Sequence, residues 1–347
     1  MGQIVRVPAF VDIHVHFREP GFTEKEDIES GVGAAAAGGY RAVCMMPNTK
    51  PAIDSATKLL EADNRGRECG EKSGVLVFAT SAMTIDQEGK ELVDFEEMDA
   101  ANTLCYESIG HGVCGITEDG KTLYDYKLME RVCEAAARLG LLVMSHAEPE
   151  ADIVRRDIEL SKKTGASIHF QHISLAESIA SIREAKAEGL HITCETAPHY
   201  FALTESEKRT NAKMNPPLRT EKDRLAIIEG LVDGTIDCIA TDHAPHEAAV
   251  KEVPYEDAAN GVIGLETAFP ISYTLLVKTG LITIERLVQL MSENPAEIIG
   301  LPSDNRYVEL DLETPFTIDS SSFRSKARNT PFDGMKVYGK VLRTVSI

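Results

Sequence analysis

Eight short apolar runs recur along the chain, and segments with helical periodicity separate most of them. Runs of this length, bounded by turn-forming residues, are typical of buried β-strands. Between two of the runs, Leu128, Val132, Ala135 and Ala136 share one face of an expected helix. Eight alternations of strand and helix predict a parallel sheet closed into a (β/α)8 TIM barrel. The runs are FVDIHVH, YRAVCMMPN, GVLVFAT, GVCGITED, LLVMSHAE, SIHFQHIS, HITCETAPH and DCIATDHAPH.

Most of these runs end in a histidine, aspartate or asparagine. In an α/β barrel the carboxyl ends of the strands meet on one face, where active sites are built. Imidazoles and carboxylates are also ligands of divalent transition metals. The pattern therefore predicts a metal site formed by residues far apart in the chain. The candidate ligands are His14, His16, Asp119, His146, His172 and Asp242.

Each candidate ligand also has a simpler interpretation. His14 and His16 lie two apart on a strand and face one side, but such a pair can be two core or surface histidines. His146 and His172 can each be a hydrogen-bonded core histidine, and Asp242 can cap a helix or form a buried ion pair. The shared position at strand ends favours the metal site. In contrast, His169 lies near a strand start and is expected to be structural or exposed.

The composition narrows the class of protein. The hydrophobic content of 43% is enough for a large core, and the formal net charge is −19. That charge argues against nucleic acid or an anionic membrane as partner, and it means that local cations must capture any anionic substrate. No apolar run is long enough to span a membrane, and the first residues do not resemble a signal peptide, so a cytoplasmic location is expected.

The seven cysteines include no C-x-x-C pair, and several lie inside apolar runs. In a reducing compartment such residues behave as small hydrophobic side chains. We expect them to be buried, reduced thiols.

After about residue 307 the pattern changes to alternating polar and apolar residues without helices. This change predicts strands outside the barrel. The expected domains are a barrel over residues 8–305 and a small β appendage from residues 1–7 and 306–347.

The motifs resemble those of the type I dihydroorotases of the amidohydrolase superfamily, from about residue 5 to the end. The similar segments are VDIHVHFREPG, MMPNTKPAID, TEDGKTLYD, MSHAE, QHIS, CETAPHYFALTE, KMNPPLR, ATDHAPH, GVIGLETAFP and SSFRSKARNTPFDGMKVYGKVL. The resemblance implies the reversible cyclisation of N-carbamoyl-L-aspartate to L-dihydroorotate in de novo pyrimidine (UMP) biosynthesis.

The resemblance also implies two Zn²⁺ ions, bridged by Asp119 and a hydroxide. One ion would be held by His14, His16, Asp119 and Asp242, and the other by His146, His172 and Asp119. Many relatives use a carboxylated lysine as the bridge, but the fourth run has no lysine before Asp119. The implied mechanism is attack by a zinc-bound hydroxide, with Asp242 as general acid and base.

A second implied group binds the substrate. Arg18 would pair with the substrate carboxylate, although a surface ion pair with Glu19 or Glu24 is the alternative for this residue. The substrate-binding candidates are Arg18, Asn48, Asn215 and His246, with His199 and Gly264 as weaker members.

Two departures from the family pattern affect these expectations. The chain opens almost directly on the first barrel strand, so the β appendage should be reduced. The segment between His146 and His172 is also short for the family, which leaves substrate access and subunit contacts open.

Two other functions remain as alternatives. A related cyclic amidohydrolase, such as a hydantoinase or allantoinase, would share the metals but is expected to carry a bridging lysine. A non-catalytic scaffold for aspartate transcarbamoylase would be expected to lack ligands. The expected partner is a small-molecule substrate, with a homodimer or association with aspartate transcarbamoylase left open.

Overall fold

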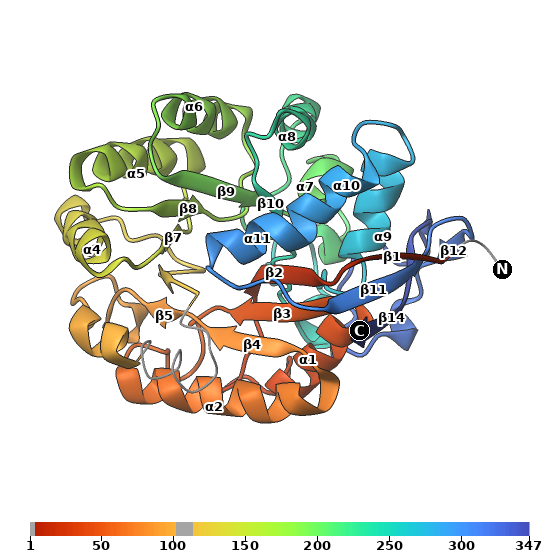
Figure 1. Cartoon of the computed structure of the whole chain (residues 1–347), viewed down its shortest axis with the longest axis horizontal. Helices are drawn as coiled ribbons and strands as arrows, with labels where there is room; N and C mark the ends of the chain where they lie inside the picture. Colours follow the sequence, from red (N-terminus) through yellow and green to blue (C-terminus); the bar gives the residue numbers. More distant parts are fainter. Residues whose placement is uncertain (1–3, 102–113, 347) are drawn as a thin grey trace.

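A parallel barrel with eight strand positions is the main feature of the computed structural model, which describes residues 4–101 and 114–346 (Figure 1). Nine strands of the described residues fill these positions, because β4 and β5 share one. One sheet has the order β2-β3-β4 and the other β10-β9-β8-β7-β6-β5, and β5 follows β4 after a single residue. A parallel bridge between Val15 and His243 joins the remaining edges. The predicted TIM barrel is therefore confirmed. Its strands are β2 (Phe10–Val15), β3 (Tyr40–Met45), β4 (Leu76–Ala79), β5 (Ser81–Ala82), β6 (Ile116–Thr117), β7 (Val143–Ser145), β8 (Ile168–Phe170), β9 (Ile192–Thr196) and β10 (Cys238–Ile239).

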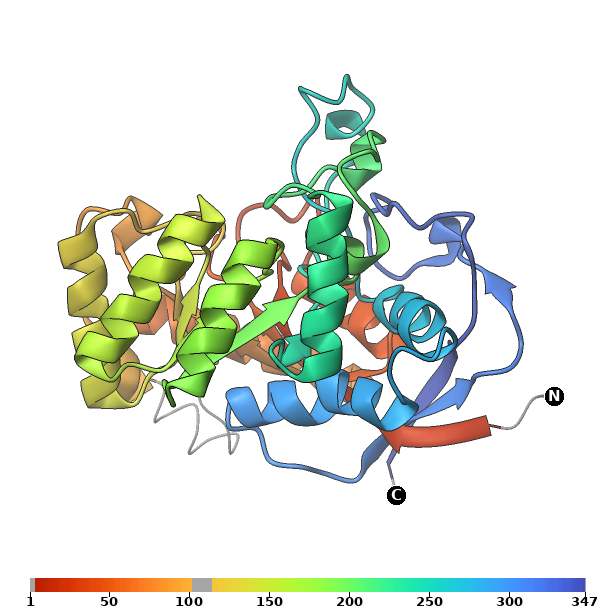
Figure 2. The same cartoon turned by 90° about the horizontal axis from the view of Figure 1, so that it is seen from above.

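Helices surround the strands, as Figures 1 and 2 show. In α4 the buried face contains Val132, Ala135 and Ala136, while the side chain of Asp125 caps the first turn and Gly140 ends the helix with φ 71°. The helices are α1 (Ile28–Ala37), α2 (Ala56–Ser73), α4 (Tyr126–Leu139), α5 (Glu150–Thr164), α6 (Ala176–Ala187), α7 (Pro198–Ala202), α8 (Glu221–Asp233), α9 (Ala268–Ser272), α10 (Ile284–Val288) and α11 (Asn294–Ile298).

The expectation of seven reduced thiols is wrong for two cysteines in the interior of the barrel. Cys44 in β3 and Cys114 next to β6 form a disulfide inside the apolar cluster that fills the barrel. Both side chains face inward, and their Cα atoms are 6.3 Å apart, within the range that a disulfide spans. Four other cysteines are free and buried, and Cys105 lies outside the described residues.

A small antiparallel sheet packs beside the barrel. It has the order β1-β11-β14, with β1 (Ile4–Pro8), β11 (Arg306–Asp311) and β14 (Lys340–Ser346). A second pair of strands, β12 (Phe316–Thr317) and β13 (Lys336–Val337), encloses a segment that returns to the barrel. In that segment Ser325 donates to Glu26, which lies just before α1. The C-terminal segment therefore contacts the barrel on the side where β2 ends.

The chain offers no helix with the length and apolar character needed to cross a membrane, in the part that the structure describes.

Two glycines of α1 give a matched test of how this helix packs next to β2. A Cβ on Gly31 would lie 2.3 Å from the ring of Phe17, which is fully buried, whereas the nearest atom to a Cβ on Gly33 is 3.6 Å away. Gly31→Ala should cost about 1–3 kcal/mol through overpacking. Gly33→Ala should instead stabilise by up to about 1 kcal/mol through helix propensity. Denaturation midpoints in urea measure both changes, and equal midpoints for the two variants would contradict this packing.

Candidate metal centre and substrate pocket

The six predicted ligands come together at the carboxyl ends of the barrel strands. His14 lies near the end of β2 and His16 just beyond it, and the other four follow β6, β7, β8 and β10. All six side chains are buried. Residues from position 14 to position 242 thus surround one point of the barrel face.

His14 and His16 face the carboxylates of Asp119 and Asp242. His16 Nε2 lies 3.1 Å from Asp242 Oδ1 and 3.4 Å from Asp119 Oδ2. His14 Nε2 lies 3.5 Å from Asp119 Oδ1 and 3.6 Å from Asp242 Oδ1. Two imidazole nitrogens and two carboxylates therefore point at a common space.

Asp119 also faces a second pair of histidines. Its Oδ1 lies 2.9 Å from His146 Nδ1 and 3.4 Å from His172 Nε2. These two ring nitrogens are 2.8 Å from each other. A single carboxylate thus lies between two histidine pairs, which is the position of a shared ligand.

The chemistry of this group of side chains fits metal ions. The buried atoms His14 Nε2 and Asp119 Oδ2 make no hydrogen bond within the described residues. Buried polar atoms without partners are costly, and a cation between them would satisfy both. Burial by itself would raise the pKa of Asp119, but the facing histidines hold that pKa well below its usual range. The carboxylate is thus ionised at neutral pH, as a metal ligand must be.

Three residues of this region have left-handed backbone conformations. The φ angles are 63° for Arg18, 36° for His172 and 47° for Asp242, although none of these residues is glycine. Such conformations cost free energy and persist where the surrounding structure imposes them, often at functional sites.

Glu195 in β9 orients His14 from behind, and the motif analysis did not single it out. Glu195 Oε1 lies 2.5 Å from His14 Nδ1 and also accepts a hydrogen bond from the backbone N–H of His172. His169 Nε2 lies 3.2 Å from the other carboxylate oxygen. The sequence did contain a signal, because a charged residue inside an apolar strand needs a buried partner.

His169 was expected to be structural or exposed, and the structure agrees with the first of these interpretations. It is fully buried and contacts Glu195, which in turn contacts the candidate ligand His14. It is the second residue of the three-residue strand β8, which agrees with the expected position near a strand start.

A pocket of about 240 Å³ opens in front of the candidate ligands. It is lined by five of the six ligands, and by all four residues predicted to bind the substrate: Arg18, Asn48, Asn215 and His246. Asn48 has a second contact, since its Oδ1 lies 2.9 Å from His16 Nδ1 and accepts a hydrogen bond from that ring.

Two of the weaker predictions lie outside the pocket lining. His199 is buried, its Nε2 has no hydrogen-bond partner in the described chain, and burial lowers its pKa to about 4. Gly264 packs against Thr241 behind the site, and its N–H contacts His243 Nδ1 at 3.2 Å. Neither residue is part of the pocket lining, although His199 is close enough to Asp242 and His172 for their charges to affect its pKa.

Arg18 supplies positive charge to the pocket. It forms no ion pair with any described residue, and its buried Nε has no hydrogen-bond partner. Burial lowers the pKa of Arg18 to about 10, which leaves it charged at neutral pH. The alternative of an ion pair with Glu19 is wrong, because Glu19 pairs with Arg65 at 3.0 Å. The guanidinium is thus available to an anion.

His246 is neutral beside this cation. Burial and the charge of Arg18 lower its pKa to about 3. Its Nε2 lies 2.7 Å from the carbonyl oxygen of Asn260 and therefore donates to it, while Nδ1 has no partner in the described chain.

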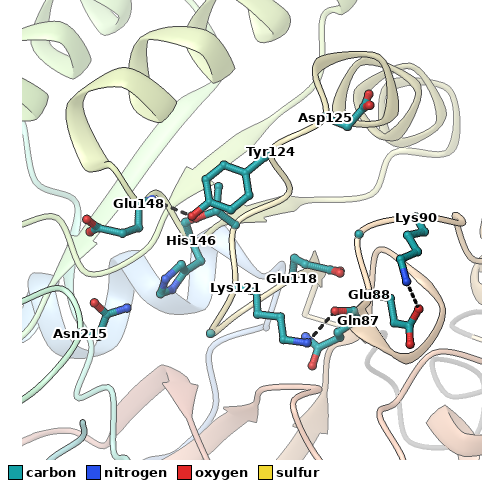
Figure 3. A pocket seen from close by; sticks show the side chains of 13 residues that line it. Gln87, Glu88, Lys90, Glu118, Lys121, Tyr124, Asp125, His146, Glu148 and Asn215 are labelled. Carbon is teal, nitrogen blue, oxygen red and sulfur yellow. Dashed lines mark hydrogen bonds and ion pairs between the residues drawn. The ribbon is translucent and has the colours of Figure 1, made fainter.

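A larger hollow of about 660 Å³ adjoins the substrate pocket and shares Gly120, His146 and Asn215 with it. Figure 3 shows Lys121 in this hollow, directed toward Gln87. Lys121 Nζ donates to the carbonyl oxygen of Gln87 at 2.8 Å. The ammonium group of this lysine is therefore held by Gln87, and it forms no ion pair with Asp119 in the described structure.

Comparisons with known proteins agree with the site. The model of the amidohydrolase family matches residues 5–345. The dihydroorotase of Desulforapulum autotrophicum is 42% identical over 377 residues, which cover 98% of this chain and 85% of that protein. The dihydroorotase of Acetivibrio thermocellus is 39% identical over 381 residues, covering 99% and 86%. An L-hydantoinase (dihydropyrimidinase) from Arthrobacter aurescens has the same fold, with a TM-score of 0.87 at 24% identity over 98% of this chain and 84% of that one.

The chain therefore belongs to the amidohydrolase family, whose members are metal-dependent hydrolases. Within this family it belongs to the dihydroorotases, a group of cyclic amidohydrolases.

The contact between Glu195 and His14 generates a testable prediction. Glu195→Gln should weaken metal affinity by about 10- to 100-fold, because the amide cannot hold the imidazole as the carboxylate does. Glu150→Gln is the matched control, since Glu150 is equally buried but accepts hydrogen bonds from Ser174 and Leu175. Competition with a chelator measures both affinities. Wild-type affinity in Glu195→Gln would show that this contact does not orient the ligand.

Proposed function

We propose that this site catalyses the reversible conversion of N-carbamoyl-L-aspartate to L-dihydroorotate, the ring-closing step of de novo pyrimidine biosynthesis. The observation that carries the proposal is the position of Arg18, a cation without an ion-pair partner among the described residues, in a pocket that the His and Asp cluster also lines. Membership of the dihydroorotase group supports the choice of substrate.

We further propose two Zn²⁺ positions. His14, His16 and Asp242 would hold one ion, His146 and His172 the other, and Asp119 would be shared. When bound, such ions lower the pKa of a water so that it can act as a nucleophile near pH 7, and they polarise the amide carbonyl.

Asp242 is proposed as the group that moves the proton. It lines the pocket, and burial would raise its pKa, but the hydrogen bond from His16 and the nearby imidazoles lower it. The carboxylate is therefore in the basic form at neutral pH. In ring opening it takes the proton of the nucleophile as the C–O bond forms, and it delivers that proton to the ring nitrogen as the C–N bond breaks. Ring closure is the reverse.

Arg18 is proposed to hold the substrate carboxylate. A guanidinium can form two parallel hydrogen bonds with a carboxylate, and this one is buried, where such a pair is stronger than in water. Asn48, Asn215 and His246 line the same pocket and would complete the binding of the substrate.

We also propose the division of the chain into a barrel (residues 8–305) and a β appendage (residues 1–7 and 306–347). The substrate-binding roles of His199 and Gly264 stay predictions, since neither residue lines the pocket. A homodimer and association with aspartate transcarbamoylase remain predictions.

The role of Asp242 predicts a large loss of turnover. In metal-loaded protein, Asp242→Asn should lower kcat by about 100- to 10,000-fold, because the amide cannot accept the proton. Asp237→Asn is the control, since Asp237 lies just before β10 and pairs with Lys186 instead. Steady-state rates with dihydroorotate and with carbamoyl aspartate, together with the metal content of each variant, test this prediction.

Three outcomes of that assay would contradict the proposed function or the proposed role of Asp242. Full activity in metal-replete Asp242→Asn would remove the proton-transfer role. No turnover by the metal-replete wild type would favour a scaffold. Hydrolysis of hydantoin or allantoin without that of dihydroorotate would move the chain to a neighbouring activity.

The role of Arg18 predicts an effect that depends on the charge of the substrate. Arg18→Met should lower kcat/KM for dihydroorotate by at least about tenfold, since a charge-assisted hydrogen bond contributes about 1.5–3 kcal/mol. The same variant should leave kcat/KM nearly unchanged for dihydrouracil, which lacks the carboxylate. Arg65→Met, which removes the partner of Glu19, serves as the control. An equal loss on both substrates would contradict a carboxylate-binding role.

A further inference from the structure

The connection after β10 forms one wall of the substrate pocket, although it has little regular structure. Residues 244, 246, 260 and 261 line the pocket, and the only regular element from residue 244 to residue 261 in the described structure is a short 3-10 turn, Ala248–Val250. A segment of this kind needs side-chain contacts to stay in one conformation.

Lys251 belongs to this connection, and its side chain turns inward. The residue is 3% exposed, and Nζ donates to three backbone carbonyls. The distances are 2.8 Å to Ala259, 2.9 Å to Gly261 and 3.2 Å to Lys213. All three hydrogens of the ammonium group therefore have acceptors.

The ammonium group has no carboxylate partner among the described residues. This is unusual for a buried lysine in a chain with 55 acidic residues. Burial, together with a smaller effect of the nearby charge of Lys213, lowers the pKa of Lys251 to about 8. The cation is thus held by the dipoles of the connection itself and not by an ion pair.

Asn329, from the C-terminal segment, holds the same carbonyl from another direction. Its Nδ2 donates to Gly261 at 3.0 Å and to Ala244 at 3.1 Å, and its Oδ1 accepts from the N–H of His246. Asn329 is also buried. The two ends of the wall are thereby joined to each other and to the C-terminal segment.

Gly261 packs closely against the His246 side chain, so fixing Gly261 also restricts His246. Gly261 has a φ of 132°, and a Cβ there would lie 2.8 Å from the carbonyl oxygen of Ala244 and 3.0 Å from His246 Cδ2. Only glycine fits this conformation and this close approach. The preceding residue, Asn260, accepts the hydrogen bond from His246 Nε2. The positions of residues 260 and 261 therefore set the orientation of the imidazole beside Arg18.

We propose that Lys251 is a positioning residue for substrate binding, which fixes residues 259–261 so that His246 is held at the carboxylate end of the pocket. Asn329 acts on the same carbonyl and shares this role. The inference rests on the proposed function for its effect on KM, but the restraint itself can be measured without turnover.

The test compares Lys251→Met with Lys213→Met in metal-loaded, full-length protein. Lys213 is a matched control, because its Nζ also donates to a carbonyl of this connection, that of Glu256, but from the exposed side. Lys251→Met should raise KM for dihydroorotate at least about tenfold and change kcat by less than about threefold, with unchanged metal content. Lys213→Met should stay within about twofold of the wild type in both parameters.

Hydrogen exchange provides the readout that does not depend on activity. The amides of residues 244–261 should exchange at least about tenfold faster in Lys251→Met than in the wild type, while those of the barrel strands stay unchanged. If Lys251→Met does not fold, Asn329→Ala should show the same changes in KM and exchange. In the double variant the two effects on KM should be less than multiplicative, since both residues hold Gly261.

Two results would overturn the inference. The first is wild-type KM and wild-type exchange in Lys251→Met. The second is an equal fall in kcat with loss of metal, which would indicate a general structural defect. A wild type that does not turn over dihydroorotate would refute the proposed function alone, and the exchange data would then decide whether Lys251 restrains the wall.

Discussion

The Asp119 carboxylate is buried between His14, His146 and His172, and its charge can be kept there only by the groups that surround it. Isolated charges are expensive inside a protein, so this arrangement requires either protonated imidazoles or bound cations. Bound cations agree better with the geometry, because buried atoms of Asp119 and His14 have no hydrogen-bond partner within residues 4–101 and 114–346. The need to hold metal thus explains why so many charged and polar groups meet at one barrel face.

The barrel strands fix the positions of the candidate ligand side chains. Each candidate ligand lies near the end of a buried strand or shortly after it, so the direction of its side chain is set by the sheet and not by a long loop. Glu195 and Asn48 then fix the ring orientation of His14 and His16. The substrate side is built differently. There the wall is an irregular connection, and buried side chains such as Lys251 and Asn329 hold its carbonyls in place of a sheet.

The barrel and the six candidate ligands were predictable from the sequence for one physical reason. Strand ends in a parallel barrel converge, so the residue type at the end of each apolar run was sufficient to group His14 with Asp242 although 228 positions separate them in the chain. The grouping of the ligands depended on position along strands and needed no side-chain detail. The place of Arg18 in the pocket was instead predicted from the resemblance to the dihydroorotases.

The supporting residues could not be predicted in the same way. Glu195 and Lys251 act on partners that are distant in sequence, and for Lys251 those partners are backbone carbonyls, which no residue type reveals. His199 and Gly264 do not line the pocket, and their positions depend on how α7 and the connection after β10 pack, which no strand pattern predicts. The Cys44–Cys114 disulfide required knowledge of which side of each strand faces inward.

The central claim is that the chain holds two metal ions with Asp119 between them. Anomalous scattering at the zinc edge from crystals grown with Zn²⁺ tests it most directly. The account predicts two peaks, one beside His14, His16 and Asp242 and the other beside His146 and His172, with Asp119 contacting both. A single peak at either position, or no peak at this face of the barrel, would contradict it.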